Sequence, residues 1–386
     1  MRTTGDQHLV KKINKAIVLD VIRTNSPLSR ARLSDMTGLH KGTVSALVGE
    51  LIEERFVYEI GFGQSSGGRK PVMLLFNKTA GHAVGVDLGV NYVLAVLTDL
   101  EGQIVAETQV ELERQDVEFV YGKLADAMRN LIGQAPDSPY GIVGAGVGVA
   151  GIVDGEGNVL FAPNLEWENV DLKHRLENEF GFPVVIENEA NAGALGEKHY
   201  GTGKNASNLV YLSVGIGIGA GIVIGKQLFK GGAGFSGEIG HTTIETNGKK
   251  CRCGNNGCWE RYASERAVLE LARPLGVDRL EALVGLADRE SPEAIRVFQQ
   301  VGEKLGIGIA NIVNTFNPEL IIIGNRMTRA EKWIRPAIER VVRERALPFH
   351  RRQVDIRFAS LDTHSTVLGA AYCAISAFFA KDRVTL

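Results

Sequence analysis

The feature that most constrains this chain is a cluster of one histidine and three cysteines within 18 residues. Nine residues separate His241 from Cys251, and Cys253 and Cys258 follow. Three cysteines and one histidine are the ligand set of a closed, tetrahedral zinc site. Because protein would fill all four positions, we expect a structural Zn²⁺ that activates no water. A redox-active or incidental cluster is the alternative that the spacing leaves open.

Length and composition limit the other possibilities. At 386 residues the chain exceeds one ordinary domain, so two or three are expected. It contains no run of about 18 apolar residues, and its N-terminus has no apolar core, so neither a membrane span nor a secretory signal is expected. The fourth cysteine, Cys373, stands apart, which does not fit a disulfide scaffold. Together these features predict a cytoplasmic protein.

Three helices are predicted at the N-terminus. An apolar stripe that recurs every four residues, from Leu9 through Ile17 to Val21, predicts the first. The second lies between Ser29, a typical N-cap, and Gly38, a typical C-terminal stop. A third begins near residue 40 and carries apolar residues at helical spacing. A short helix, a turn with glycine and a second helix form a helix-turn-helix.

A hairpin with a long basic tip follows these helices. Two strand-like runs, 56–62 and 72–77, enclose a loop rich in glycine, serine and basic residues. Such a loop is typical of a wing that contacts phosphates or the minor groove, although it could also be a plain linker. We therefore predict a winged helix-turn-helix DNA-binding domain over residues 1–78.

Charge and side-chain size favour DNA as the partner of this domain. Residues 1–80 hold 12 Lys and Arg against 7 Asp and Glu, whereas the rest of the chain is acidic. The third helix presents small and polar side chains opposite its apolar stripe; these suit a major groove, or an ordinary solvated face. The candidate DNA contacts are Arg30, Lys41, Gly42, Thr43, Ser45, Ser65, Ser66, Arg69 and Lys70. Because helix-turn-helix proteins usually recognise palindromic half-sites, we expect a homodimer on palindromic operator DNA.

The rest of the chain shows one strand pattern twice. Three short strands open it, at 83–89, 92–98 and 103–111, and a similar group returns over 209–230. This repetition predicts a duplicated α/β body with a ligand cleft between two lobes. The glycine-rich run 215–221 could cradle a phosphate or only permit close strand packing. The expected divisions are 79–190 for the first lobe, 191–365 for the second, and 366–386 for a C-terminal helix that packs back on the first.

Carboxylates and amides gather near a predicted strand end and around the cysteine cluster. The run Glu187-Asn188-Glu189-Ala190-Asn191 follows a strand at 183–186. Glu238 precedes His241 by three residues, and Glu260 follows the last cysteine by two. Since each sugar hydroxyl both donates and accepts, such groups around a metal-stiffened loop suit polyol recognition. Unrelated surface acids are the alternative.

Several motifs together are typical of one family. They are DLG at 87–89, PN at 163–164, ENEAN at 187–191, GIGAG at 217–221, SGEIGH at 236–241, CRCGNNGCWE at 251–260, NPELIIIG at 317–324 and LGAA at 368–371. On these, residues 82–374 resemble the ROK family of sugar kinases and sugar-responsive repressors, which has a duplicated actin-like fold. The winged helix is typical of its repressor branch. Within that branch, GQSSGGRKPVMLLFN and ENEANAGALGEK resemble regulators of xylose use in Gram-positive bacteria.

The resemblance implies a sugar site and a sugar. D-xylose is the expected ligand, with glucose or a xyloside as alternatives. His241 would offer one ring nitrogen to zinc and the other to the sugar. The implied sugar-binding residues are Asn164, Asn188, Glu189, Glu238, His241 and Glu260.

The chain departs from the family kinases on the ATP side. Glu189 stands where those kinases have an aspartate general base, and the extra methylene displaces the carboxylate. Val90 and Asn91 replace Gly-Thr, Ile216 replaces a threonine, and Asn325 stands where a second glycine is frequent. We therefore expect no catalytic residue and no enzyme, but a repressor that leaves its operator when sugar binds. An active kinase with an accessory head, or a regulator that responds to a protein partner, are the alternatives.

Overall fold

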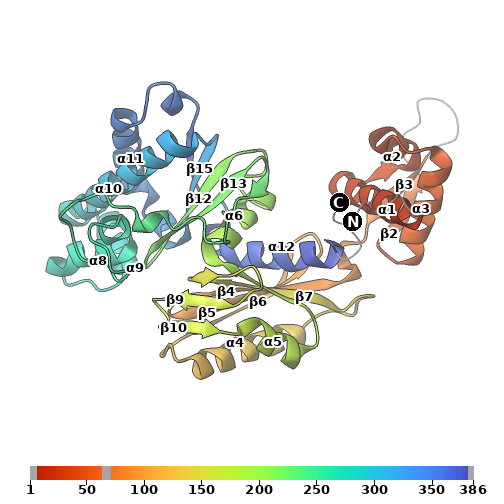
Figure 1. Ribbon diagram of the computed structural model, residues 1–386, viewed down its shortest axis with the longest axis horizontal. Helices are drawn as coiled ribbons and strands as arrows, with labels where there is room; N and C mark the ends of the chain where they lie inside the picture. Colours follow the sequence, from red (N-terminus) through yellow and green to blue (C-terminus); the bar gives the residue numbers. More distant parts are fainter. Residues whose placement is uncertain (1–6, 63–70, 381–386) are drawn as a thin grey trace.

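The computed structural model describes residues 7–62 and 71–380, which form a small head and a body of two lobes (Figure 1). In the head, the side chain of Ser29 accepts a hydrogen bond from the Arg32 N–H and caps α2, and Gly38, with φ of 70°, ends it. The head consists of α1 (Gln7–Asn25), β1 (Leu28–Ser29), α2 (Arg30–Thr37), α3 (Lys41–Glu53), β2 (Val57–Phe62) and β3 (Val72–Phe76). The order β1-β3-β2 includes one short strand that the sequence did not predict.

The apolar stripe predicted for α1 is only partly its buried face. Val21 packs against the core of the head, whereas Ile17 is 42% exposed. The fully buried residues are Val18 and Ile22, which are also four apart, so the deepest core contacts fall one position later than the stripe.

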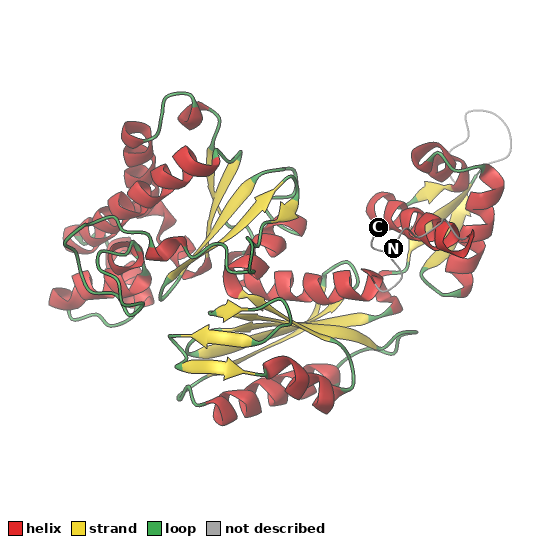
Figure 2. Ribbon diagram, in the orientation of Figure 1, coloured by secondary structure: helices red, strands yellow, loops and turns green. Residues whose placement is uncertain are grey.

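The first lobe is built on a five-stranded sheet of order β11-β7-β4-β5-β6. Helices α4 and α5 cover one face of this sheet, and the C-terminal helix α12 covers the other (Figures 1 and 2). A small sheet of order β10-β9-β8 extends the lobe. Its elements are η1 (Lys78–Ala80), β4 (His82–Leu88), β5 (Tyr92–Asp99), β6 (Ile104–Glu111), α4 (Val117–Ile132), β7 (Ile142–Val149), β8 (Ile152–Val153), β9 (Val159–Ala162), β10 (Trp167–Val170), α5 (Leu172–Phe180) and β11 (Val184–Asn188).

The second lobe repeats this plan. Its sheet has the order β14-β13-β12-β15-β16, in which three antiparallel strands are followed by two parallel ones, as in the first lobe. Its elements are α6 (Glu189–His199), β12 (Leu209–Val214), β13 (Ile218–Ile224), β14 (Gln227–Leu228), η2 (Ile239–His241), α7 (Glu260–Ala263), α8 (Glu265–Ala272), η3 (Arg273–Leu275), α9 (Leu280–Asp288), α10 (Pro292–Phe316), β15 (Leu320–Gly324), η4 (Asn325–Ala330), α11 (Glu331–Arg345), η5 (His350–Arg352), β16 (Asp355–Phe358) and η6 (Asp362–His364). The repetition is that of a duplicated, actin-like body.

Helix α12 (Ser365–Ala380) is unusually apolar. With its preceding turn it forms the one helix, within the described residues, that is long and apolar enough to span a membrane. Half of this stretch is buried, and it packs against α6, β4 and β7. Its composition is therefore explained by its place in the core.

Candidate functional site

A cavity of about 250 Å³ lies between the two lobes. Its walls come from the turn after β4, the β8–β9 hairpin, the start of α6, the turn between β12 and β13, and the cysteine-rich loop. All six predicted sugar residues line it: Asn164, Asn188, Glu189, Glu238, His241 and Glu260. Segments from Gly89 to Arg326 thus meet around one ligand-sized space.

The start of α6 places two of these residues. Asn188 is the N-cap: its Oδ1 accepts from the N–H groups of Ala190 at 2.9 Å and Asn191 at 3.2 Å, and its Nδ2 donates to Gly151 O at 2.9 Å. One N–H of this amide is left for a ligand. Glu189 follows in the first helical turn, where the helix dipole favours a carboxylate.

The short helix η2 positions Glu238 and His241 against β13. Gly237 has φ of 102°, and a Cβ there would lie 1.9 Å from Ala220 O; a Cβ on Gly240 would lie 2.1 Å from Ile218 O. Only glycine allows this close approach. The His241 ring then lies between two groups, with Nδ1 3.7 Å from Cys251 Sγ and Nε2 3.9 Å from a Glu238 oxygen. Burial is the main cause that raises the pKa of Glu238.

The cysteine-rich loop brings four metal-ligating side chains together. Ligand atoms of His241, Cys251, Cys253 and Cys258 all lie within 4.8 Å of one another. Gly257 has φ of 74°, and a Cβ there would lie 1.8 Å from Glu245 O, so the loop is folded too tightly for another residue. The donor set and its geometry fit a closed four-coordinate metal site.

This loop leads directly to Glu260. Trp259 is buried, and its Nε1 donates to Lys304 O at 2.7 Å, while Gly308 leaves room for the indole ring. Glu260 then begins α7 and its Oε1 lies 3.9 Å from His241 Nδ1. We call Asn164, Glu238, His241 and Glu260 the metal-loop group.

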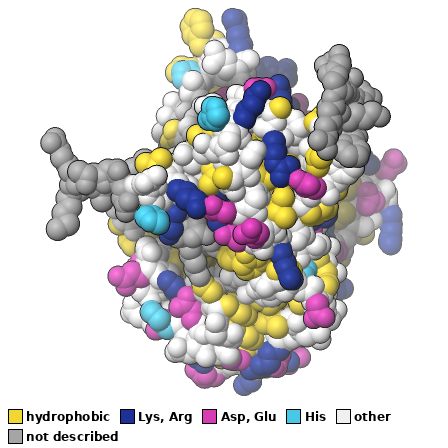
Figure 3. Space-filling view, turned by 90° about the vertical axis from the view of Figure 1, so that its right-hand side faces the viewer, with side chains coloured by type: hydrophobic (Ala, Val, Ile, Leu, Met, Phe, Trp, Pro, Cys, Tyr) yellow, Lys and Arg dark blue, Asp and Glu magenta, His cyan; other side chains and the backbone are white. Residues whose placement is uncertain are grey.

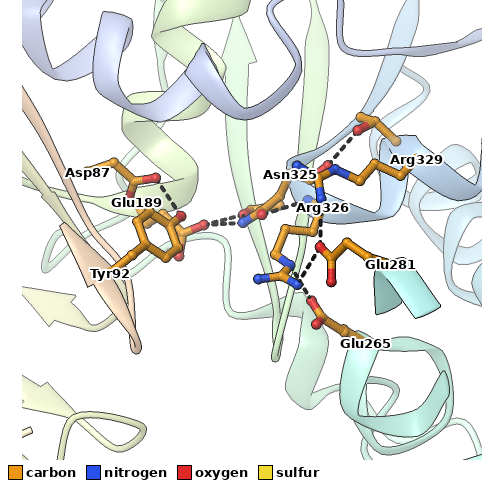
Figure 4. A network of polar contacts seen from close by, with 10 residues as sticks. Asp87, Tyr92, Glu189, Glu265, Glu281, Asn325, Arg326 and Arg329 are labelled. Atoms are coloured by element: carbon orange, nitrogen blue, oxygen red, sulfur yellow. Dashed lines mark hydrogen bonds and ion pairs between the residues drawn. The ribbon is translucent and has the colours of Figure 1, made fainter. Parts of the chain in front are cut away.

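A second set of polar residues lines the same region but is bonded within itself (Figure 4). Glu189 Oε1 accepts from Ser213 Oγ at 2.5 Å and from Asn325 Nδ2 at 2.7 Å. Tyr92 Oη donates to Asp87 Oδ2 at 2.7 Å. Asp87 is 2% exposed, and burial together with the nearby Glu189 carboxylate raises its pKa well above the usual range.

Ion pairs extend this set away from Glu189. Arg326 lies 3.0 Å from Glu265 and 2.9 Å from Glu281, and Arg329 lies 2.6 Å from Glu281. Burial raises the pKa of Glu265, and Arg326 opposes that effect. We call the whole set the network group: Asp87, Tyr92, Glu189, Ser213, Glu265, Glu281, Asn325, Arg326 and Arg329.

The glycine-rich run serves packing at its C-terminal part. A Cβ on Gly221 would lie 2.3 Å from Ala190 O, so β13 approaches α6 too closely for a side chain. Gly215 and Gly217 instead line the cavity, where a Cβ on Gly217 would lie 2.9 Å from Glu260 Oε2. The run therefore shapes both the strand packing and the cavity wall.

The candidate DNA-binding face is the outer side of α3. His40 caps the helix, and Lys41, Gly42, Thr43 and Ser45 are exposed while the apolar side faces the core. Arg30 is paired with Glu59 at 2.6 Å. Ser65, Ser66, Arg69 and Lys70 lie outside the described residues. On the side of the molecule shown in Figure 3, Lys and Arg side chains are interspersed with Asp and Glu, so charge alone does not mark one face.

The sequence did not point to several cavity residues. Phe161 of β9 is 39% exposed and lines the cavity beside Ile152, its cross-strand partner. Arg266 donates to Asn164 Oδ1 at 3.3 Å. Ser213 is the last residue but one of β12, and that position near the end of a buried strand was the one available signal for it.

With a helix-turn-helix head and a two-lobed body around a polar cleft, the fold has the organisation of a ROK-type regulator. The chain belongs to the ROK family, which its residues 83–377 match. Residues 18–61 match the IclR helix-turn-helix domain.

Individual relatives match almost the whole chain. The chain is 44% identical to the xylose repressor of Bacillus spizizenii over 97% of its length and 98% of that protein. It is 43% identical to the xylose repressor of Bacillus subtilis, over 99% of both.

Two solved structures are similar to this fold. A ROK family transcriptional regulator described as a homologue of E. coli MLC protein matches with a TM-score of 0.82 and 29% identity, over 98% of both chains. A ROK family glucokinase from Streptomyces griseus, in complex with glucose and AMPPNP, matches with a TM-score of 0.71 and 29% identity, over 77% of this chain and all of that one.

Proposed function

We propose that this chain is a cytoplasmic, sugar-responsive transcriptional repressor of xylose-use genes, which D-xylose releases from its operator. The observation that carries the proposal is the joint presence of an exposed helix-turn-helix and a polar inter-lobe cavity in a chain 43–44% identical to xylose repressors. Release requires only that the sugar prefer one conformation of the protein, and a coupling of about 1–3 kcal/mol changes DNA affinity roughly 5–150-fold.

The sugar contacts are Asn164, Asn188, Glu189, Glu238, His241 and Glu260. Their amides and carboxylates supply both donors and acceptors, as sugar hydroxyls require. Wall residues such as Phe161 and Ile152 offer apolar surface for the C–H groups of the ring. D-xylose is preferred over glucose or a xyloside because of the named relatives.

The metal is a structural Zn²⁺ held by His241, Cys251, Cys253 and Cys258. Bound there, the metal would stiffen the loop that carries Glu238 and Glu260. His241 would offer one ring nitrogen to it and leave the other for a sugar hydroxyl. This assignment is supported by the distances between the four ligand atoms, which all lie within 4.8 Å of one another.

The chain does not transfer phosphate. The longer side chain of Glu189 displaces the carboxylate from the position of the kinases' aspartate base, and its Oε1 already accepts two hydrogen bonds, which leaves only Oε2 for a sugar hydroxyl. Asp87 is buried against Tyr92, and the raised pKa of its carboxyl disfavours the charge that a phosphate-bound cation would need.

The head binds palindromic operator DNA as part of a homodimer. The first turn of α3 supplies Gly42, Thr43 and Ser45 for base edges and Lys41 for a phosphate. Arg30, Ser65, Ser66, Arg69 and Lys70 contact the backbone or the minor groove.

The substitution Glu189→Ala tests the sugar site. It is expected to leave operator affinity within about threefold while abolishing release by xylose, because it removes a charge-assisted acceptor worth about 1.5–3 kcal/mol. Gel-shift titrations with and without xylose measure both. If xylose releases the variant at the wild-type concentration, the assigned site is wrong. A separate assay tests phosphoryl transfer: sugar phosphate formed by the wild type from ATP-Mg²⁺ and xylose or glucose would show that the chain is a kinase.

A further inference from the structure

Helix α12 joins the cleft to the head. Its 16 residues span roughly 24 Å. Figure 1 shows it running from the junction of the lobes, beside α6, to the side of the molecule where the head lies. The contacts at its two ends differ in kind, and both bear on how a sugar could act on DNA binding.

The N-terminal end of α12 is bound to α6, the helix that begins with Asn188 and Glu189. Thr366 Oγ1 donates to the backbone carbonyl of Glu189 at 3.3 Å. Ser365 Oγ donates at 2.9 Å to Glu197, a buried carboxylate that also accepts the Leu361 N–H at 3.0 Å. A shift of α6 on sugar binding therefore acts directly on the start of α12.

Glycines bring the two helices into backbone contact. A Cβ on Gly369 of α12 would lie 1.7 Å from Ala192 O, and a Cβ on Gly196 of α6 would lie 2.0 Å from Ser365 O. No flexible side chain separates the helices at these points, so they have little freedom to move independently. Where α12 crosses the first-lobe sheet, Gly85 and Gly146 provide the same close approach to its carbonyls.

The C-terminal end of α12 lies in the hydrophobic core of the head. The Phe379 ring is 5.8 Å from Phe56 and 6.3 Å from Phe76, and Arg23 of α1 lies 5.0 Å above it. The Phe378 ring is 6.1 Å from Phe56. These contacts connect α12 to α1, to β3 and to Phe56, the residue just before β2.

We infer that Phe378 and Phe379 are the positioning residues through which the sugar cleft acts on the DNA-binding head. Sugar contacts at Glu189 shift α6, α12 moves with it across the sheet, and the phenylalanines repack against Phe56 and Phe76. Helix shifts of about 1–2 Å at a packed interface are sufficient for such switching. The inference rests on the proposed sugar-responsive function.

Tyr140 makes a second connection between the head and the body. Its Oη donates to Glu54 O at 2.9 Å, and its ring is stacked on Phe56 at 4.6 Å. The same ring lies 5.6 Å from Phe378, so Tyr140, just before β7 in the first lobe, belongs to the same aromatic cluster as the end of α12. The segment before β7 thus joins the head to the first lobe, and α12 joins it to α6.

The test measures coupling separately from binding. In the full-length, zinc-loaded protein, the variants are Phe378→Ala and Phe379→Leu, and Phe316→Ala is the control, a partly exposed phenylalanine at the end of α10. For each, calorimetry gives the xylose Kd, and fluorescence anisotropy gives the operator Kd with and without xylose. We expect the wild-type and Phe316→Ala ratios of operator Kd to be roughly 5–150, and those of the α12 variants to fall to within about twofold of one, with the xylose Kd changed less than threefold.

An unchanged ratio in both α12 variants would overturn the inference and leave the proposed function standing. If xylose does not change the DNA affinity of the wild-type protein, both the inference and the proposed function are wrong. If the variants fail to fold, hydrogen exchange on the wild type decides: xylose should change amide exchange in the last turn of α12 and at Phe56–Val57, but not in α4 on the opposite face of the sheet. Unchanged exchange at α12 and Phe56 would overturn the inference.

Discussion

The metal-loop group and the network group line one cleft, but their polar atoms are used differently. Among the described residues, the single charged contact of Glu238 is His241, at 3.9 Å. Glu189, in contrast, accepts from Ser213 and Asn325 at 2.5 and 2.7 Å, and Arg326 pairs with two carboxylates. One group has hydrogen-bonding capacity left for a ligand, whereas the other is bonded mostly within itself, with Asp87 Oδ1 as a buried oxygen that accepts no hydrogen bond from the described residues.

This difference indicates what each part of the cleft does. Glu238 lines the cavity, and His241 at 3.9 Å is beyond hydrogen-bond distance, so the Glu238 carboxylate can still accept from a ligand hydroxyl. A network bonded mostly within itself favours one arrangement of the lobes and offers fewer free groups to a ligand. The contrast agrees with the proposal that the chain binds a sugar on a kinase-like body without phosphorylating it.

Loss of the metal is expected to have the largest effect, and to affect the metal-loop group alone. Cys258→Ser removes a buried ligand from a site of a kind that contributes roughly 10–16 kcal/mol of apparent binding free energy. We expect xylose affinity to fall more than about 100-fold while operator binding persists. Calorimetry and metal analysis measure this, with Cys373→Ser as the matched cysteine control. Xylose affinity that survives the loss of metal would separate the loop from the sugar site.

Glu238 of the metal-loop group and Tyr92 of the network group should differ in their effect on xylose binding; Glu189 is itself a proposed sugar contact and stands outside this comparison. Glu238→Ala removes a charged acceptor, so xylose Kd should rise about 10–150-fold. Tyr92→Phe removes a hydroxyl bonded to Asp87 and should change xylose Kd less than about threefold. Isothermal titration of both variants tests the contrast, and equal losses in the two would erase the distinction between the groups.

The smallest effect is expected on stability, at Asp87. Its folded-state pKa is raised, so the folded protein holds its proton more tightly than the unfolded chain. The wild type therefore loses stability as pH rises from the unfolded pKa through the raised folded one. Asp87→Asn, which can still accept from Tyr92, should raise stability by about 0.5–2 kcal/mol at pH 8 and by less at pH 5. Thermal melts at both pH values measure this; a variant that melts below the wild type at pH 8 would mean that the Asp87 charge is stabilising.

The sequence could predict features that depend on residues close together in the chain, but not features that depend on distant ones. Ser29 and Gly38 bound α2 through contacts only a few residues long, and the four metal ligands lie within one loop. The repeated strand pattern also predicted the duplicated body. Glu189 is hydrogen-bonded to Ser213 and Asn325, which lie 24 and 136 positions away in the sequence. No local sequence pattern predicts such pairs.

Two further features depended on tertiary packing. Asn188 belongs to a polar motif, but its main contacts cap α6, which follows from where that helix begins. In α1 the fold buries Val18 and Ile22 most deeply, four residues apart like the predicted stripe but one position later, and spacing alone could not decide between these two adjacent faces.

The most direct measurement is a titration of D-xylose, with D-glucose as the control, into the zinc-loaded protein bound to DNA from its own upstream region, followed by fluorescence anisotropy. The account predicts that the protein binds this DNA and that xylose, unlike glucose at the same concentration, releases it with a roughly 5–150-fold loss of affinity. Failure to bind the DNA, or binding that xylose leaves unchanged, would contradict it.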